Sequence, residues 1–368
     1  MNPAAAPSAT VSAVDRACSE LRSGRPILLN DTDDALGTGG SIVLPAALAD
    51  PHWTAWAVRQ TSGFLCAPLP DTIADALDLP LMVGTTGSRS SSTAFTVSVD
   101  ATAGTTTGIS ATDRARTARV LADPESVPAD LIRPGHLVPI RVHEGTEHPR
   151  TGRNEIAVDL CRIAGLPPVA VVGDLVADDG EILRPGSVPT LGIKHGLTTL
   201  SARDVLEHRL FHGTGTAGRV TRGNSTLMRT AQADFDATVF HDEVTGADHT
   251  VLRGPSTPAV PTVSVHLECH SGEVFGALTC TCGRRLQEAL QRTAQDGGLL
   301  IYLRRGTSTS RLSSPHQCTL ADTGAVAAIL SDLDVDTIRL RGGGIAPTAL
   351  ASADITVVAG PNREQEQS

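Results

Sequence analysis

Three of the seven cysteines in this chain lie close together, within residues 269–283. Cys280 and Cys282 are separated by one residue, and Cys269 precedes them in a segment that contains several glycines. Thiolates bind Zn²⁺ readily, and three protein ligands with one open position form the usual catalytic zinc site. Glycine lets the backbone fold tightly around an ion. The stretch therefore predicts a local fold in which these three cysteines converge on a zinc ion.

The alternative interpretation is three unrelated buried thiols, because free cysteine is among the most buried residue types. A disulfide between Cys280 and Cys282 is disfavoured, since a bridge requires particular Cβ separations. The total of seven cysteines is odd and shows no framework spacing, which is typical of a reducing cytoplasm.

Length and composition bound the class of protein. A chain of 368 residues predicts about two domains, and an aromatic content of 2% means cores built from Val, Leu, Ile and Ala. The net charge of −10 argues against a nucleic-acid or anionic-membrane surface. No segment has the apolar length of a membrane span, and the first residues lack the pattern of a signal peptide. We therefore expect a soluble cytoplasmic protein with neither nucleic acid nor membrane as a partner.

Apolar runs of strand length alternate with helical patterns along both halves of the chain, which predicts two α/β or α+β domains. The expected organisation is a disordered start (1–12), a first domain (13–211), a Gly/Thr-rich linker (212–230), a second domain (231–360) and a polar tail (361–368).

Local patterns in the first domain predict individual elements. Residues 93–100 alternate and are β-branched, which predicts one strand. Residues 133–136 predict a turn, and residues 154–164 predict a helix with one apolar face. Ser110 or Thr112 is expected to cap a separate helix, which runs through Ala115 and Val120.

Several segments of residues 13–211 resemble 3,4-dihydroxy-2-butanone 4-phosphate synthase. The resemblance implies an α+β fold and the conversion of ribulose 5-phosphate with loss of formate. In that family a carboxylate and a histidine hold a divalent cation, usually Mg²⁺. The matching segments are residues 61–66 (TSGFLC), 93–100 (TAFTVSVD), 106–115 (TTGISATDRA), 133–136 (RPGH), 155–160 (EIAVDL) and 195–197 (HGL).

The cysteine stretch and its surroundings resemble GTP cyclohydrolase II, in residues 265–269 (VHLEC), 272–276 (GEVFG) and 280–283 (CTCG). The resemblance implies a shortened α/β domain with a zinc ion that activates water. The order of the two halves is similar to the bifunctional enzyme of riboflavin biosynthesis. Both families are usually dimeric, which implies a homodimer or a heterodimer with an active homologue.

The chain departs from the synthase pattern at its metal ligands. The family's acidic signature falls in residues 33–41, where both glutamates are absent, and its metal-binding histidine is replaced by Arg153. A guanidinium stays protonated and cannot ligate a cation. The late catalytic glutamate corresponds to Asp174, while Cys66 and His136 remain as candidate catalytic residues. We therefore expect the Mg²⁺ ligands to be missing.

Part of an anion pocket is retained beside the predicted helix start. In the family Arg150 contacts the sugar phosphate, and here Arg153 and Asn154 lie near it, where backbone donors and the helix dipole favour anions. The two interpretations are a pocket for a small phosphorylated metabolite and a pair of solvated arginines. The glycine-rich loop 30–40 likewise either cradles a phosphate or is an ordinary surface turn.

The second domain departs from its family in the residues that hold GTP. Glu268, with His266 or His270, is a candidate to position zinc-bound water, and the alternative is support of the zinc ligands. The departures are Ser264 for an arginine, Arg285 for a glutamine, residues 305–310 for the GTP-holding loop, Thr319 and Ala321 near a missing Asp-x-Arg pair, and residues 342–344 for Asn-Asn-Pro.

Three functions follow from this pattern. The first is ordinary bifunctional riboflavin synthesis, and the second is a diverged enzyme acting on another phosphorylated or heterocyclic substrate. The third is a zinc-stabilised, non-catalytic pseudoenzyme that pairs with an active homologue or senses a metabolite. The substitutions favour a diverged paralogue with degenerate active sites that retains its zinc.

Overall fold

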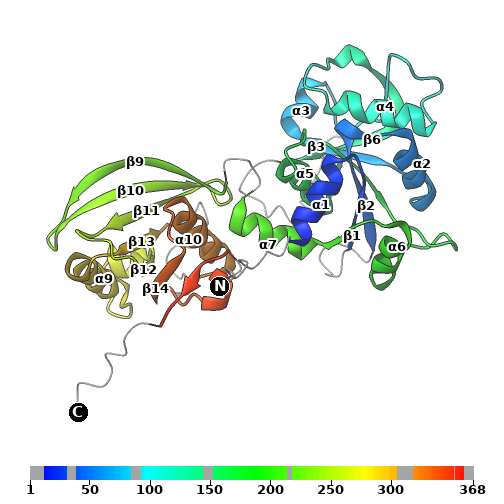
Figure 1. The fold of residues 1–368 in the computed structure, drawn as a ribbon. Coiled ribbons are helices and arrows are strands. Elements are labelled where there is room, and N and C mark those ends of the chain that lie inside the picture. The colour runs from blue at the N-terminus through cyan, green and yellow to red at the C-terminus, as the bar shows by residue number, and fades with distance from the viewer. Residues whose placement is uncertain are drawn as a thin grey trace, which may run out of the picture. The chain divides into compact units, whose positions relative to one another are not determined.

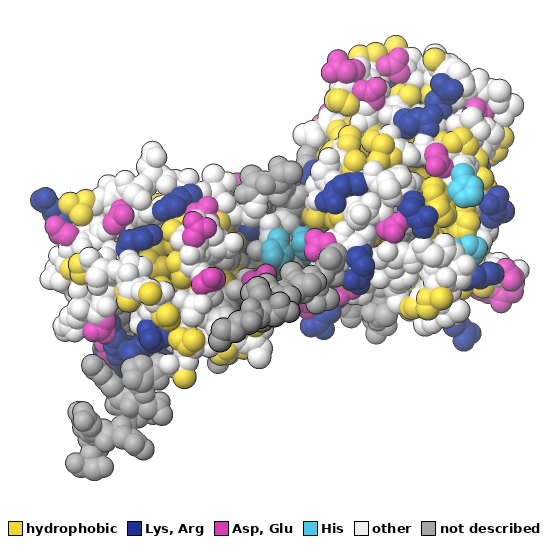
Figure 2. Space-filling model, viewed as in Figure 1, with side chains coloured by type: hydrophobic (Ala, Val, Ile, Leu, Met, Phe, Trp, Pro, Cys, Tyr) yellow, Lys and Arg dark blue, Asp and Glu magenta, His cyan; other side chains and the backbone are white. Residues whose placement is uncertain are grey.

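The computed structural model describes residues 12–30, 39–83, 93–143, 152–213, 218–304, 318–351 and 353–359. The chain forms two compact units, Met1–His208 and Arg209–Ser368, and each is described by itself (Figure 1). No helix among the described residues is long and apolar enough to cross a membrane. On the face drawn in Figure 2, acidic and basic side chains are interspersed over both units.

The first unit is built on an eight-stranded mixed sheet with the order β4-β6-β3-β7-β2-β1-β8, in which β5 pairs with β6. Strands β1 and β8 are parallel, as are β3 and β6, whereas β2 is antiparallel to β1 and β7. The strands are β1 (Ile27–Asn30), β2 (Gly40–Pro45), β3 (Cys66–Pro70), β4 (Ala94–Phe95), β5 (Val99–Ala101), β6 (Leu131–Val142), β7 (Ala170–Asp174) and β8 (Thr199–Ser201).

Helices cover both faces of this sheet, which is why its central strands are apolar on both sides. Leu28 packs in the core beneath α2, α3, α4 and α6, while its neighbours Ile27 and Leu29 pack in the core beneath α1, α5 and α7. The helices are α1 (Ala13–Arg22), α2 (Pro51–Gln60), α3 (Asp71–Ala76), α4 (Ala111–Ala122), α5 (Arg153–Ile163), α6 (Val188–His195) and α7 (Ala202–His212), with 3₁₀ turns at Ala46–Leu48, Pro128–Asp130 and Pro185–Ser187.

The structure differs from two local predictions in this unit. Residues 93–100 form two short strands, β4 and the start of β5, rather than one. Residues 133–136, predicted as a turn, continue strand β6, because β5 pairs with the first part of β6. Gly135 permits this pairing, since a Cβ there would lie 2.0 Å from the backbone of Val99. The predicted cap is confirmed, since Ser110 Oγ accepts a hydrogen bond from the Asp113 N–H at the start of α4.

The second unit contains a seven-stranded sheet with the order β15-β14-β12-β13-β11-β10-β9. Strands β9, β10, β11 and β13 are antiparallel neighbours, whereas β12 is parallel to β13 and β14. The elements are β9 (Val220–Arg229), β10 (Asp234–Asp242), β11 (Ala247–Arg253), β12 (Thr262–Leu267), α8 (His270–Glu273), α9 (Cys282–Asp296), β13 (Leu299–Leu303), α10 (Leu320–Asp332), β14 (Thr337–Gly342), α11 (Pro347–Ala351) and β15 (Thr356–Val357).

The expected linker over residues 212–230 is wrong for most of its length, because residues 220–229 form the edge strand β9. The sequence does not predict this strand because nearly all of its side chains are exposed. An edge strand with little core contact lacks the apolar alternation of a buried strand.

Helices α9 and α10 pack on opposite faces of the second sheet. On strand β12, Val263 and Val265 pack in the core that contains α10. Side chains alternate along a strand, so Ser264 and His266 face the side covered by α9. This arrangement places the polar residues of β12 next to the cysteine stretch, which joins β12 to α9.

Candidate functional site

The three cysteines of the second unit converge as the sequence predicts. Cys269 follows the end of β12, Cys280 lies in the next loop, and Cys282 begins α9. Their Sγ atoms all lie within 4.8 Å of one another, and those of Cys269 and Cys280 are 3.5 Å apart. Cys269 and Cys282 are buried, and Cys280 is half-buried.

Close packing by glycine allows this convergence. A Cβ on Gly272 would lie 2.7 Å from Cys280 Sγ, so no other residue type fits there without moving the thiol. The backbone at Gly276 has a φ of +60°, a conformation that glycine adopts without strain.

Glu273 ties the cysteine cluster to the sheet. Its Oε1 accepts hydrogen bonds from the Cys269 N–H and from His266 Nε2, both at 2.8 Å. Its Oε2 accepts a hydrogen bond of 2.6 Å from the Tyr302 hydroxyl on β13, and Tyr302 stacks on His266. The carboxylate therefore fixes the backbone of one cysteine through partners on two strands.

The thiols perturb one another's protonation. Burial, with the neighbouring thiols of Cys280 and Cys269, raises the pKa of Cys282 to about 12. The Cys282 N–H donates to Cys280 and lowers the pKa of the Cys280 thiol. A divalent cation at this position would stabilise all three as thiolates. Three soft donors around a common point fit a zinc site with one position open to water or a ligand.

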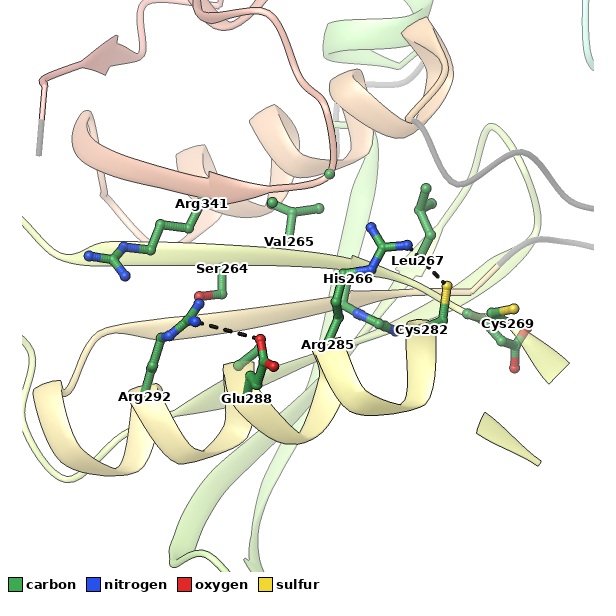
Figure 3. A pocket seen from close by; sticks show the side chains of 14 residues that line it. Ser264, Val265, His266, Leu267, Cys269, Cys282, Arg285, Glu288, Arg292 and Arg341 are labelled. Carbon is green, nitrogen blue, oxygen red and sulfur yellow. Dashed lines mark hydrogen bonds and ion pairs between the residues drawn. The ribbon is translucent and has the colours of Figure 1, made fainter. Parts of the chain in front are cut away.

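A pocket of about 170 Å³ adjoins the cluster (Figure 3). Along α9, positions one turn apart face it, and strands β12 and β14 form its other side. The polar and charged side chains that line it are Ser264, His266, Glu268, Cys269, Cys282, Arg285, Glu288, Arg292 and Arg341.

Glu268, predicted as a catalytic residue, lines this pocket but lies close to two basic side chains. Its Oε1 lies 3.6 Å from His270 Nε2 and 3.5 Å from Arg304 Nε. Arg285 Nη2 lies 3.7 Å from Cys282 Sγ, so a positive charge stands beside the cluster. The other histidine considered, His266, is held by Glu273.

Four of the residues predicted in the first unit also come together. Cys66, Arg153, Asn154 and Asp174 line one cavity of about 60 Å³, together with Ser41. Arg153 Nη1 forms an ion pair with Asp174 Oδ1. Ser41 Oγ lies 3.3 Å from Asp174 Oδ1 and accepts a hydrogen bond of 3.4 Å from Arg153.

Cys66 is a weak nucleophile in this cavity. Burial raises the pKa of its thiol to about 12, although the charge of Arg153 acts in the opposite direction. The side chain therefore remains a neutral thiol at physiological pH, and its catalytic assignment gains no support from protonation.

His136 does not line this cavity, contrary to its grouping with the other candidates. Its ring atom Nδ1 lies 2.7 Å from Asp100 Oδ2, and its backbone N–H donates a hydrogen bond of 2.9 Å to Asp100 Oδ1. Asp100 is a nearly buried residue that the sequence reasoning did not single out. Arg150 and residues 31–38 of the glycine-rich loop lie outside the described residues.

Sequence reasoning also missed Glu273, Tyr302, Arg292 and Arg341. Glu273 lies inside the motif at residues 272–276, which could have directed attention to it. The contribution of the other three depends on strand register and on which face of the sheet each side chain occupies, and a single sequence reveals neither.

Family models match both halves of the chain. The model for 3,4-dihydroxy-2-butanone 4-phosphate synthase matches residues 15–208, and the model for GTP cyclohydrolase II matches residues 221–359. The chain is 38% identical to riboflavin biosynthesis protein RibBA of Salinispora arenicola over 358 residues, which cover 90% of this chain and 83% of the relative. It is 34% identical to RibBA of Nocardia farcinica over 354 residues, covering 89% of this chain and 84% of the relative.

A solved structure covers both units. The crystal structure of RibBX from A. baumannii, a two-domain 3,4-dihydroxy-2-butanone 4-phosphate synthase, is 26% identical and has a TM-score of 0.65. The match covers 95% of this chain and 100% of that one. The expected fold, a synthase-like unit followed by a cyclohydrolase-like unit, is confirmed by these matches.

Proposed function

The chain belongs to the RibBA family of riboflavin-biosynthesis proteins, and we propose that it is a diverged member that retains a zinc centre but not the Mg²⁺-dependent synthase reaction. Cys269, Cys280 and Cys282 would hold the zinc ion. When bound there, zinc supplies a Lewis acid able to activate water or polarise a ligand. The residues of this chain position the ion through Glu273 and shape the pocket beside it.

The observation that carries the proposal is the ion pair between Arg153 and Asp174. The family resemblance expects a histidine ligand at position 153 and a catalytic carboxylate at position 174. Here a permanent cation, which cannot donate a lone pair, is bonded to that carboxylate. The described residues of the cavity therefore do not fit a Mg²⁺ site, because the one carboxylate among them is already bonded to a guanidinium.

The direct test supplies the purified chain with ribulose 5-phosphate and Mg²⁺ and measures formate. We expect no formate above the background without enzyme, because the carboxylate is neutralised by Arg153. The RibBA relative from Salinispora arenicola, assayed in parallel, controls for substrate quality. Formate release by this chain at a rate comparable to the relative would refute the loss of synthase function.

A substitution at position 153 tests whether Arg153 is the cause of the loss. Arg153→His restores the residue type that the resemblance expects, and we expect Mg²⁺ to bind more tightly to this variant than to the unmodified chain. Isothermal titration measures the difference, with Arg162→His on the same helix as the matched control. Equal Mg²⁺ affinity in all three proteins would remove Arg153 as the cause.

Two roles, one catalytic and one non-catalytic, are compatible with a retained zinc centre. The arginine-lined pocket beside the cluster favours a diverged enzyme that acts on another phosphorylated or heterocyclic substrate. Metal analysis and activity screening with Cys280→Ser test this, since the variant is expected to lose zinc and any zinc-dependent turnover together. A found activity that survives zinc loss would exclude the zinc-dependent version.

The alternative is a non-catalytic member that pairs with an active homologue, favoured by substitutions in both units. Tagged protein expressed with a complete RibBA relative is expected to form a mixed complex if this alternative holds. A strictly self-associating or monomeric chain would count against it. GTP turnover with Zn²⁺, measured by formate release, separates both versions from an ordinary cyclohydrolase.

A further inference from the structure

We propose that Arg292 and Arg341 form an anion subsite across Ser264, which binds the phosphate group of a small ligand in the pocket beside the cysteine cluster. The inference deepens the proposed function, because it names the ligand class of the zinc-adjacent pocket and rests on that pocket being used. The position of the subsite follows from strand register, helix periodicity and charge.

Strand register places Arg341 beside Ser264. In the parallel pairing of β12 with β14, Ser264 is the direct partner of Arg341. Paired residues on neighbouring strands point to the same face of a sheet. The flanking residue Val263 and its partner Leu340 pack against the α10 core on the opposite face. Ser264 and Arg341 therefore share the face that α9 covers.

Helix periodicity brings Arg292 to the same place. Cys282, Arg285, Glu288 and Arg292 recur at intervals of three or four residues and all line the pocket. Figure 3 shows Arg292 reaching from α9 toward Ser264, and Arg285 at the other end beside Cys282. Arg292, Arg341 and Ser264 thus line one end of the pocket, while the cysteine cluster lies at the other.

The acidic side chains of the pocket already have cationic partners. Glu288 lies 3.6 Å from both Arg284 and Arg292, and Glu268 lies 3.5 Å from Arg304. Arg341 has no ion-pair or hydrogen-bond partner among the residues that the structure describes. The pocket therefore carries positive charge that its own carboxylates do not balance, at the end distant from the cysteines.

A phosphate group suits this arrangement. Guanidinium groups donate paired hydrogen bonds to phosphate oxygens, and the Ser264 hydroxyl in the same lining is an additional donor. A volume of about 170 Å³ is below the range of roughly 300–1,000 Å³ typical of drug-sized ligand sites. The ligand is therefore a compact phosphate ester, with its phosphate at Arg292 and Arg341 and its remaining part directed toward the cluster.

The test titrates the full-length, zinc-containing protein with inorganic phosphate by calorimetry at constant ionic strength. We expect saturable binding that weakens as sodium chloride is raised, because the arginines are exposed to solvent. Arg341→Gln and Arg292→Gln are each expected to weaken binding at least about tenfold. The matched control is Arg284→Gln, which lies on the same helix outside the pocket lining and is expected to change affinity less than about twofold.

Several results would overturn the subsite. They are an absence of saturable binding by zinc-containing protein, equal weakening by Arg284→Gln and Arg341→Gln, and binding that survives both pocket substitutions because phosphate sits on the metal alone. Succinate binding as tight as phosphate would overturn the phosphate assignment. Zinc content measured on each sample keeps the proposals separate, since zinc-free protein that still binds phosphate through Arg341 refutes only the zinc centre.

Discussion

At the scale of single residues, Glu273 is expected to determine how firmly the cluster holds a metal. Its carboxylate accepts hydrogen bonds from Cys269, His266 and Tyr302, and Glu273→Gln keeps the shape of the side chain but removes the charge and one acceptor oxygen. Loss of such support to metal ligands typically costs about 10–100-fold in affinity. We expect a zinc affinity lower by that factor, measured by competition with a chromophoric chelator.

The matched control for this prediction is Glu288→Gln. Glu288 lines the same pocket, but its recorded partners are Arg284 and Arg292 rather than the cluster. The zinc affinity of the Glu288→Gln protein is expected to equal that of the unmodified protein. A cobalt-substituted spectrum that changes in Glu273→Gln alone would support a positioning role, whereas equal loss in both variants would contradict it.

The residues of the cluster were predictable from sequence because the three cysteines are neighbours along the chain. The pairing of Arg153 with Asp174 was not, since it depends on strand β7 bringing position 174 to the start of α5. The contact of His136 with Asp100 likewise depends on the pairing of β5 with β6. Residue type predicted which side chains are candidates for a functional site, whereas tertiary structure determines which of them are in contact.

At the scale of elements, a buried ion pair within the second unit joins the start of β9 to the end of β10. Arg219 donates to both oxygens of Asp242, at 3.0 and 2.6 Å, and to the carbonyl of Leu210 in the same unit, while both charged side chains are fully buried. Removing one partner of such a pair leaves an uncompensated charge and costs about 3–5 kcal/mol. We expect Asp242→Asn to destabilise the second unit by that amount in urea denaturation.

The same pair predicts a dependence on pH. Burial alone would raise the pKa of Asp242, but His249, whose Nε2 lies 3.5 Å from the carboxylate, together with the hydrogen bonds and charge of Arg219, holds that pKa well below its usual value. Its stabilisation is therefore complete above the unfolded pKa of about 3.9 and is lost as the pH falls toward the folded pKa. The stability difference between the unmodified protein and Asp242→Asn should narrow below about pH 4.

A surface pair provides the control for this element. His241 Nδ1 lies 2.8 Å from Asp248 Oδ1 with both side chains about half exposed, so Asp248→Asn is expected to cost at most about 1 kcal/mol. Equal destabilisation by Asp242→Asn and Asp248→Asn would contradict the prediction that the buried Arg219–Asp242 pair contributes more to stability than an exposed pair. A constant difference between unmodified protein and Asp242→Asn from pH 7 to pH 3 would refute the pH prediction.

Elements with an apolar pattern were predicted more reliably than those without one. The helix expected at residues 154–164 is present as α5, because its apolar face packs in the core. Strand β9 was assigned to a linker because nearly all its side chains are exposed. The turn expected at residues 133–136 is a strand because a non-local partner, β5, determines its conformation.

At the scale of the whole molecule, each unit has its own sheet covered by helices and its own cores. The first contains the two cores around β1 and β2, and the second contains one core beneath α10 and a smaller one beneath α9. The resemblance of each half to a different family predicted this division. It implies that a ligand of one unit stabilises that unit without the other.

Removal of zinc should therefore affect one unfolding transition only. A ligand at 1,000 times its Kd stabilises the native state by about 4 kcal/mol, which corresponds to a Tm shift of roughly 10 °C for a unit of this size. We expect differential scanning calorimetry of the full chain to show two transitions, of which a chelator lowers the one belonging to Arg209–Ser368. Cys280→Ser identifies that transition, because its position should already be low and insensitive to the chelator. If the chelator moves both transitions equally, or moves neither although metal analysis shows that zinc has been removed, the cluster does not stabilise the second unit through bound zinc.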